Sequence, residues 1–252
     1  MPRSRKTKDV QSPHPRLDDL AGQARLKAEL RRLILAARRE IRPIDHILLL
    51  GPDGTGKAAF ARAIANEIPL TLVAPSPEVL DDPVALLDVM VRMRLGCILF
   101  VERVDKLSSK SREIVMDCIA KPAPQALVPR RDRPSSHKVE LLPVPIIATA
   151  ETLPPKWRGL ALAGCFAKGR LQVLVMDPYT AGELAEIVRR AAVEAGLKIE
   201  PRAAGLIAFY AEGSPGRALT IFRRMCRFME PAVGGTIRAE AARKALRAIG
   251  YG

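Results

Sequence analysis

A glycine-rich loop between an apolar run and a helix-forming stretch constrains the fold more than any other feature of this chain. After the apolar run 46–50 comes the loop Gly51-Pro52-Asp53-Gly54-Thr55-Gly56-Lys57, and residues 58–68 are predicted to form a helix. In this order the free N–H groups at the helix N-terminus point at an anion, which is how such loops hold nucleotide phosphates. The full motif has Ser or Thr after the lysine to bind Mg²⁺, whereas this chain has Ala58, whose methyl group cannot bind a metal. The loop predicts nucleotide binding with a weakened metal site.

Apolar runs and helical stretches alternate through the first two thirds of the chain. The runs are 46–50, 70–73, 97–101, 144–149 and 171–175, and helical periodicity appears over 24–39, 84–95 and 109–120. Continuous apolar runs are typical of strands buried on both faces. The pattern therefore predicts an α/β domain with a parallel sheet flanked by helices.

The pattern changes at residue 177. Four amphipathic helices without a strand candidate are predicted over 181–195, 201–211, 215–228 and 237–248, and Ser214-Pro215 is a typical helix start. Residues 1–15 are polar, basic and rich in proline, which favours disorder. The chain is thus divided into a disordered basic tail (1–16), an α/β nucleotide-binding domain (17–176) and a small all-α domain (177–252).

The charge of the chain points to polyanionic partners. Its 41 Lys and Arg residues exceed its 27 Asp and Glu residues, which gives a net charge of +14. Such a charge favours contact with DNA or RNA, although an arginine-rich proteome without a nucleic-acid partner would give the same composition. No apolar run approaches the ~18 residues of a membrane span, and the four cysteines are widely spaced. We expect a cytoplasmic protein with no membrane contact.

Five segments match one family in their order along the chain. They are 17–23 (LDDLAGQ), 44–52 (IDHILLLGP), 64–67 (IANE), 98–101 (ILFV) and 183–190 (ELAEIVRR). Together they resemble the AAA+ ATPases, and within them the RuvB family of Holliday-junction branch-migration motors, over residues 16–250. The resemblance implies a P-loop AAA+ sheet followed by a helical lid domain. It also implies ATP or ADP as ligand, with Mg²⁺, and oligomeric rings with the nucleotide at subunit junctions.

The hydrolysis positions that the resemblance implies are substituted here. After the strand 98–101 the family has an Asp that holds Mg²⁺ and then a Glu that activates water, where this chain has Glu102 and Arg103. Glu102 is a candidate Mg²⁺ contact, one methylene longer than Asp. Arg103 cannot act as a base because its guanidinium stays protonated. We expect Asp105 to form a surface ion pair, with rescue of the missing carboxylate as the alternative.

Two further catalytic positions follow from the same resemblance. The residue that positions water falls within 148–152, where Thr149 and Thr152 are the candidates. Cys165 stands at the position of the arginine finger, a group that contributes about 10³–10⁵ in rate in related enzymes. Arg158, Lys168 and Arg170 are the candidates to take the role of this arginine.

The lid and one basic segment supply the remaining site candidates. Arg217, in the first turn of a helix, matches the lid arginine that contacts the γ-phosphate, and a solvated helix arginine is the alternative. Tyr179 is assigned to the neighbourhood of the adenine, with a core tyrosine as the alternative. A basic segment between two strand-like stretches matches the family's hairpin, which meets a partner protein, a neighbouring subunit or nucleic acid; its residues are Arg130, Arg131, Arg133 and Lys138. A solvated loop is the alternative there.

The four substitutions Ala58, Glu102, Arg103 and Cys165 all fall in the hydrolysis machinery, whereas the loop glycines and Lys57 are kept. This predicts a nucleotide-binding protein with weak or no hydrolysis, acting as a ring or accessory subunit beside AAA+ neighbours in DNA recombination or repair. The family continues into a DNA-binding winged-helix domain, and this sequence stops at Gly252, which argues against direct motor action. The alternatives are an active ATP-dependent DNA translocase that uses a partner's arginine, and a nucleotide-free structural subunit like inactive clamp-loader subunits.

Overall fold

The computed structural model describes residues 15–121, 124–129, 136–154, 157, 171–231 and 234–251. Within them the contacts divide the chain into two compact units. The second unit contains the chain from Met176 onward together with two earlier segments, Leu20–Arg25 and Gly51–Lys57, and the first contains the rest. The phosphate loop thus groups with the C-terminal helices. The division into a tail and two sequence-contiguous domains stays a prediction, and most of the predicted tail lies outside the described residues.

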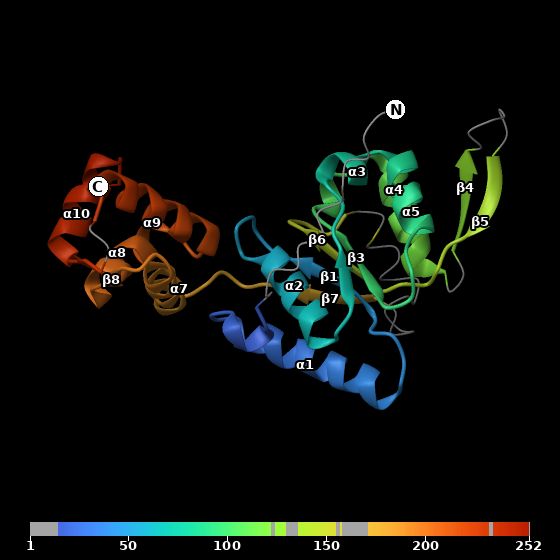
Figure 1. The fold of residues 1–252 in the computed structure, drawn as a ribbon, viewed down its shortest axis with the longest axis horizontal. Coiled ribbons are helices and arrows are strands. Elements are labelled where there is room, and N and C mark those ends of the chain that lie inside the picture. The colour runs from blue at the N-terminus through green and yellow to red at the C-terminus, as the bar shows by residue number, and fades with distance from the viewer. Residues whose placement is uncertain are drawn as a thin grey trace. The chain divides into compact units, whose positions relative to one another are not determined.

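A five-stranded sheet forms the centre of the first unit (Figure 1). Its strand order is β2 (Thr71–Val73), β3 (Cys97–Val101), β6 (Ile146–Ala150), β1 (His46–Leu50) and β7 (Leu171–Val175). Every neighbouring pair is parallel. All five residues of β6 are buried, as the continuous apolar runs require. The predicted parallel sheet is confirmed.

Helices cover both faces of this sheet. Alternate strand residues such as Leu48, Leu99 and Ile146 pack against one group of helices: α3 (Pro77–Asp81), α4 (Pro83–Val91) and α5 (Ser109–Ala120). The intervening strand residues point to the opposite face because successive side chains alternate. On that face lie α1 (Ala24–Arg39) and α2 (Lys57–Glu67) (Figure 1). A 3₁₀ turn at Leu17–Asp19 precedes α1, and another at Val104–Lys106 follows β3.

An antiparallel hairpin also belongs to the first unit. It consists of β4 (Gln125–Pro129) and β5 (Ser136–Glu140), in register from Gln125↔Glu140 to Pro129↔Ser136. This is the hairpin expected around the basic segment. Residues 130–135, between the two strands, lie outside the described residues, and they include the predicted contact residues Arg130, Arg131 and Arg133. Lys138 is exposed on β5.

The second unit is largely helical. It contains α7 (Ala181–Glu194), α8 (Pro201–Tyr210), α9 (Pro215–Met229) and α10 (Ala239–Ala248), packed around a core that includes Leu184, Val188 and Phe222. Thr180 and Glu183 form a capping box at the start of α7. The expectation of no strand was wrong: β8 (Lys198–Ile199) pairs in parallel with β9 (Thr236–Ile237). Two residues are too few to give an alternating pattern. Among the described helices of both units, none has the length and apolar character to cross a membrane.

Candidate nucleotide-binding site

The phosphate loop runs from the end of β1 to the first turn of α2, and its glycines are required by its shape. Gly54 and Gly56 have φ angles of +80° and +88°, which only glycine adopts without strain. A Cβ at Gly51 would lie 3.1 Å from the backbone oxygen of Met176. The loop therefore has the tight curvature that brings backbone N–H groups around an anion.

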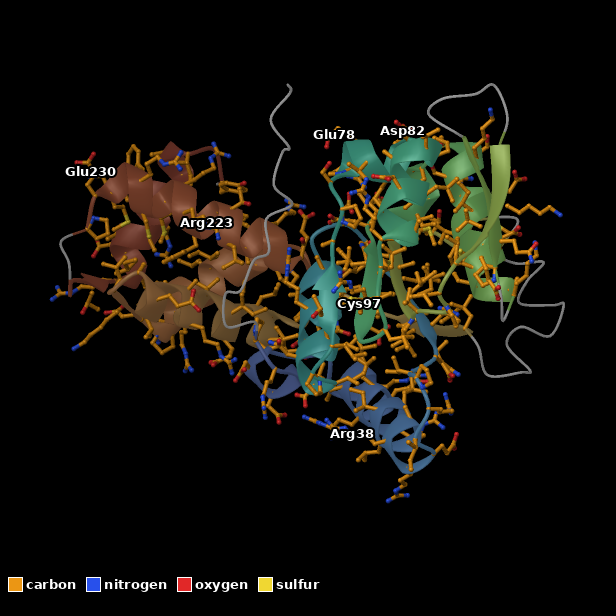
Figure 2. All side chains as sticks on the ribbon, turned by 45° about the vertical axis from the view of Figure 1, so that its right-hand side comes forward. Arg38, Glu78, Asp82, Cys97, Arg223 and Glu230 are labelled. Carbon is orange, nitrogen blue, oxygen red and sulfur yellow. The ribbon has the colours of Figure 1, made fainter. Side chains whose placement is uncertain are left out.

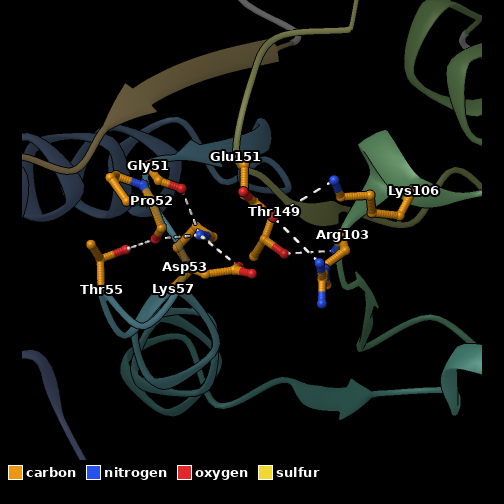
Figure 3. A network of polar contacts seen from close by, with 9 residues as sticks. All are labelled: Gly51, Pro52, Asp53, Thr55, Lys57, Arg103, Lys106, Thr149 and Glu151. Carbon is orange, nitrogen blue, oxygen red and sulfur yellow. Dashed lines mark hydrogen bonds and ion pairs between the residues drawn. The ribbon is translucent and has the colours of Figure 1, made fainter. Parts of the chain in front are cut away.

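Lys57 is held inside the loop. Its side chain is almost fully buried, and its Nζ donates to the backbone oxygens of Gly51 (2.7 Å) and Pro52 (2.8 Å) (Figure 3). Asp53 Oδ1 lies 3.9 Å from the same nitrogen. Thr55 closes the turn because its hydroxyl donates to the Pro52 oxygen at 2.8 Å. A positive charge is thus fixed within the loop, where it can form a charge-assisted hydrogen bond with a phosphate.

Helix α9 begins directly against the phosphate loop. The backbone N–H of Gly216 donates to the carbonyl oxygen of Gly54 at 2.9 Å, and a Cβ at Gly54 would lie 2.5 Å from Ser214 Oγ. Ser214 caps the helix by accepting from the Arg217 N–H, and Pro215 occupies the first turn, as the sequence predicts. The N-terminal ends of α2 and α9 therefore both adjoin the loop, and each favours a negative charge there.

Arg217 occupies the predicted place in the first turn of α9. Its guanidinium pairs with the carboxylate of Glu212, and half of its side chain is exposed. The γ-phosphate contact assigned to Arg217 stays a prediction. For this contact the guanidinium would have to leave the Glu212 carboxylate. Glu212 lies in the turn that precedes the helix and has a φ of +49°.

Tyr179 lies among three segments of the second unit. Its backbone N–H donates to the Gly213 oxygen at 3.0 Å. Its ring Cε1 is 2.9 Å from a Cβ built at Gly22, and its hydroxyl is 3.9 Å from one built at Gly56. Burial first, and the negative charge of Glu183 second, together raise the pKa of the Tyr179 phenol to about 12. Tyr179 thus lies close to the phosphate loop and belongs to the buried core of the second unit, and its contact with an adenine stays a prediction.

The sequence did not identify Gln23 as a site residue. Its backbone N–H donates to Glu183 Oε1 (3.2 Å) and its side-chain amide to the Asp177 oxygen (2.6 Å). It adopts a positive φ of 55°. Gln23 is buried and ties the N-terminal segment to the start of α7. A positive φ at a non-glycine residue is not visible in a single sequence, so no signal identified it.

In the first unit, the ends of β3 and β6 carry a separate polar cluster. The backbone N–H of Arg103 donates to Thr149 Oγ1 at 2.9 Å, and its guanidinium lies 3.3 Å from Glu151 Oε1 (Figure 3). Lys106 Nζ is 3.9 Å from the same oxygen. Arg103 adopts the left-handed conformation (φ 53°, ψ 54°), a strained state for a residue with a side chain. The pair with Glu151 was not predicted.

The structure distinguishes the two threonine candidates. Thr149 is 1% exposed and is bonded to the residue that follows Glu102, whereas Thr152 is exposed. Glu102 is exposed as well. The surface ion pair expected for Asp105 is absent from the described part of the chain, where its Oδ1 is buried without a hydrogen-bond partner. The residue as a whole is half-buried, and the surface pair stays a prediction.

The other hydrolysis candidates lie outside the described residues: Cys165, Arg158, Lys168 and Arg170. No cluster of three or more His, Cys, Asp or Glu side chains able to hold a metal occurs among the residues that are described. The Mg²⁺ contact of Glu102 stays a prediction.

Comparison with known proteins identifies relatives of both parts of the chain. A model of the Holliday junction DNA helicase RuvB P-loop domain matches residues 13–153, and one of the RuvB AAA lid domain matches residues 179–250. A solved structure of the Thermotoga maritima RuvB Holliday junction branch migration motor is similar, with a TM-score of 0.74 and 24% identity, covering 93% of this chain and 72% of that one. Two variants of the same protein give TM-scores of 0.75 and 0.73 at 24% and 25% identity, again over 93% of this chain and over 73% and 72% of theirs.

Proposed function

Because this chain belongs to the RuvB family of AAA+ proteins, we propose that it binds ATP or ADP in the phosphate loop and hydrolyses ATP weakly or not at all. It acts as a ring or accessory subunit beside AAA+ neighbours in DNA recombination or repair. The net charge of +14 and the similarity to the Thermotoga maritima RuvB Holliday junction branch migration motor support the DNA-processing role.

The observation that carries the proposal is the environment of Arg103. This residue stands where the family has the carboxylate that activates water, and its guanidinium cannot accept a proton. Its backbone is bound to Thr149 and its side chain lies beside Glu151. The position is therefore occupied by a cation with its own partner, and the water molecule that would attack the γ-phosphate lacks a base there.

The residues of the loop fit a nucleotide better than they fit a metal. Lys57, the two glycines with positive φ and the two adjoining helix N-termini form a cradle for phosphate oxygens. The bound nucleotide supplies a polyphosphate that these groups neutralise and orient. The Mg²⁺ donor set has lost the hydroxyl at Ala58 and keeps only Glu102. We assign no step to the metal.

Two measurements on the full chain test the proposal. The first is titration of a fluorescent ATP analogue, and the second is phosphate release from ATP-Mg²⁺ with and without four-way-junction DNA. Lys57→Ala removes the charge inside the loop, and Lys121→Ala removes an exposed lysine that pairs with Asp117. We expect the wild type and Lys121→Ala to bind the analogue equally and Lys57→Ala not to bind it. Phosphate release by the wild type should exceed that of Lys57→Ala only slightly or not at all, and junction DNA should not stimulate it.

Two outcomes would overturn the proposal in different ways. Phosphate release by the wild type above the Lys57→Ala level, stimulated by junction DNA, would show an active translocase. Failure of the wild type to bind the analogue would favour the nucleotide-free structural subunit. In that case saturating ATP would also leave the melting temperature unchanged, whereas a ligand at 100 times its Kd adds about 2.7 kcal/mol.

A further inference from the structure

Helix α1 carries five arginines in two rows that differ in their surroundings. Arg31 pairs with Asp18, and Arg38 donates to the backbone oxygen of Glu67, so this row is bound to the protein. Figure 2 labels Arg38 on this helix. The second row consists of three exposed arginines, Arg25, Arg32 and Arg39. Within the described chain none of these three has a hydrogen-bond or ion-pair partner.

Helix geometry aligns the second row. Its members are seven residues apart, so each step turns by about 20° and rises by about 10.5 Å, and the row spans about 21 Å. It lies opposite the buried side of α1, which is formed by Leu26, Leu30, Leu33, Ile34 and Ala37. The only exposed large apolar residue on this face is Leu35. We call this face, formed by Arg25, Ala28, Arg32, Leu35 and Arg39, the α1 arginine face.

We propose that the α1 arginine face binds the phosphate backbone of duplex nucleic acid without reading its sequence. This inference deepens the proposed DNA-processing role but does not depend on nucleotide binding. A duplex carries about one negative charge per 1.7 Å of its axis, so a row of arginines that spans about 21 Å meets several phosphates. Three exposed arginines on one side of a single helix supply the positive charges for such contacts.

The composition of the face favours this occupant over others. It has no aromatic side chain on which a base can stack, so contact is to phosphates. A membrane-surface helix needs a broad apolar side facing the lipid, whereas the apolar side of α1 is buried in the protein. Glu29, the one acidic residue of the helix, is half-buried and forms no ion pair with the row among the described contacts.

The test compares two triple variants of the full chain that lose the same charge. In the first, Arg25, Arg32 and Arg39 are replaced by Ala; in the control, the exposed Arg94, Arg202 and Arg243 are replaced by Ala. Alanine keeps α1 helical, which circular dichroism checks. Binding to a labelled duplex of about 25 base pairs is followed by fluorescence anisotropy without nucleotide. The salt concentration is varied from about 50 to about 200 mM, because phosphate contacts weaken strongly over this range.

We expect the α1 variant to bind at least about tenfold more weakly than the control. Its slope of log K against log[salt] should fall by up to about 2.7, because each phosphate contact contributes about 0.9. Replacing the three arginines by Lys should keep most of the slope, since the charge stays. Duplexes of different sequence should behave alike.

Three results would overturn the inference. In the first, the wild type fails to bind the duplex. In the second, both alanine variants lose affinity equally, which would show only an effect of net charge. In the third, the α1 variant keeps full duplex binding but loses binding to a poly-glutamate peptide, which would assign the face to an acidic protein. The proposed nucleotide binding is measured separately with the Lys57→Ala variant, so failure of one proposal leaves the other intact.

Discussion

Gly216 donates its backbone N–H to the carbonyl oxygen of Gly54 at 2.9 Å, which brings the first turn of α9 against the phosphate loop. The contact is between two backbones, so it depends on the absence of a side chain at both positions. A Cβ at Gly216 would lie 3.0 Å from the Gly54 Cα, and one at Gly54 would lie 2.5 Å from Ser214 Oγ. The sequence of the loop alone gives no reason for a glycine at position 216.

Replacing Gly216 by Ala should weaken nucleotide binding without unfolding the lid. The new methyl group meets backbone atoms of Gly54, which cannot rotate away, so the helix N-terminus must move from the loop. A helix terminus beside an anion contributes about 0.3–1 kcal/mol, and up to about 2 kcal/mol when partly buried. We therefore expect the affinity for the fluorescent ATP analogue to fall by about two- to fivefold, and by up to about thirtyfold if the site is partly buried.

Gly205→Ala is the matched control, because it adds the same methyl group to α8 where no atom lies within 4 Å. Alanine has the higher helix propensity, so both variants should be as stable as the wild type in urea unfolding. Equal affinity of the wild type and both variants would show that α9 makes no contribution to the phosphate site.

The hydrogen bond between Arg103 and Thr149 should contribute measurably to stability. Thr149→Val keeps the shape of the buried side chain but removes the oxygen that accepts the Arg103 N–H. A partly buried N–H left without a partner costs about 1–3 kcal/mol. Urea unfolding should show a loss of about this size. Thr152→Val, at an exposed position, should stay within about 0.5 kcal/mol of the wild type; equal losses would contradict the role given to Thr149.

The sequence predicted the elements of the fold well because their signals are local. The apolar runs at 46–50 and 97–101 correspond directly to β1 and β3, and the Ser214-Pro215 start of α9 was identified from capping chemistry alone. Such signals depend only on neighbouring residues. The strands β8 and β9 were not predicted, because strands of two residues have no detectable hydrophobic period.

The candidate site was predicted less completely because its contacts are between distant residues. Arg103 and Glu151 are 48 residues apart, and their pairing depends on the adjacency of β3 and β6 and on the left-handed turn at Arg103. The residue substitutions were visible in the sequence, whereas their new partners were not. Asp105 illustrates the same limit, because a charged residue after a strand is usually solvated and this one has a buried oxygen.

The buried phenol of Tyr179 predicts a loss of stability in alkali. Its pKa is raised from 10.0 to about 12, first by burial and then by the charge of Glu183. Between these values the phenol ionises in the unfolded chain but stays protonated in the folded one. Unfolding then releases a proton, so the free energy of unfolding falls as pH rises. The contribution is fully present below pH 10.0 and is lost as pH rises through about 12.

Tyr179→Phe removes this ionisation and keeps the ring. Urea unfolding is therefore measured for both proteins from about pH 9 to about pH 12, roughly the range over which the phenol titrates. The free energy of unfolding of the wild type should fall relative to that of Tyr179→Phe as the pH rises. Comparing the two proteins cancels the contribution of the Cys118 thiol, whose pKa burial raises to about 12. Phenolate absorbance in the folded wild type provides the direct measurement. If the absorbance step that Tyr179→Phe removes has a midpoint near 10, the ring is solvated and does not pack between the N-terminal segment and the phosphate loop.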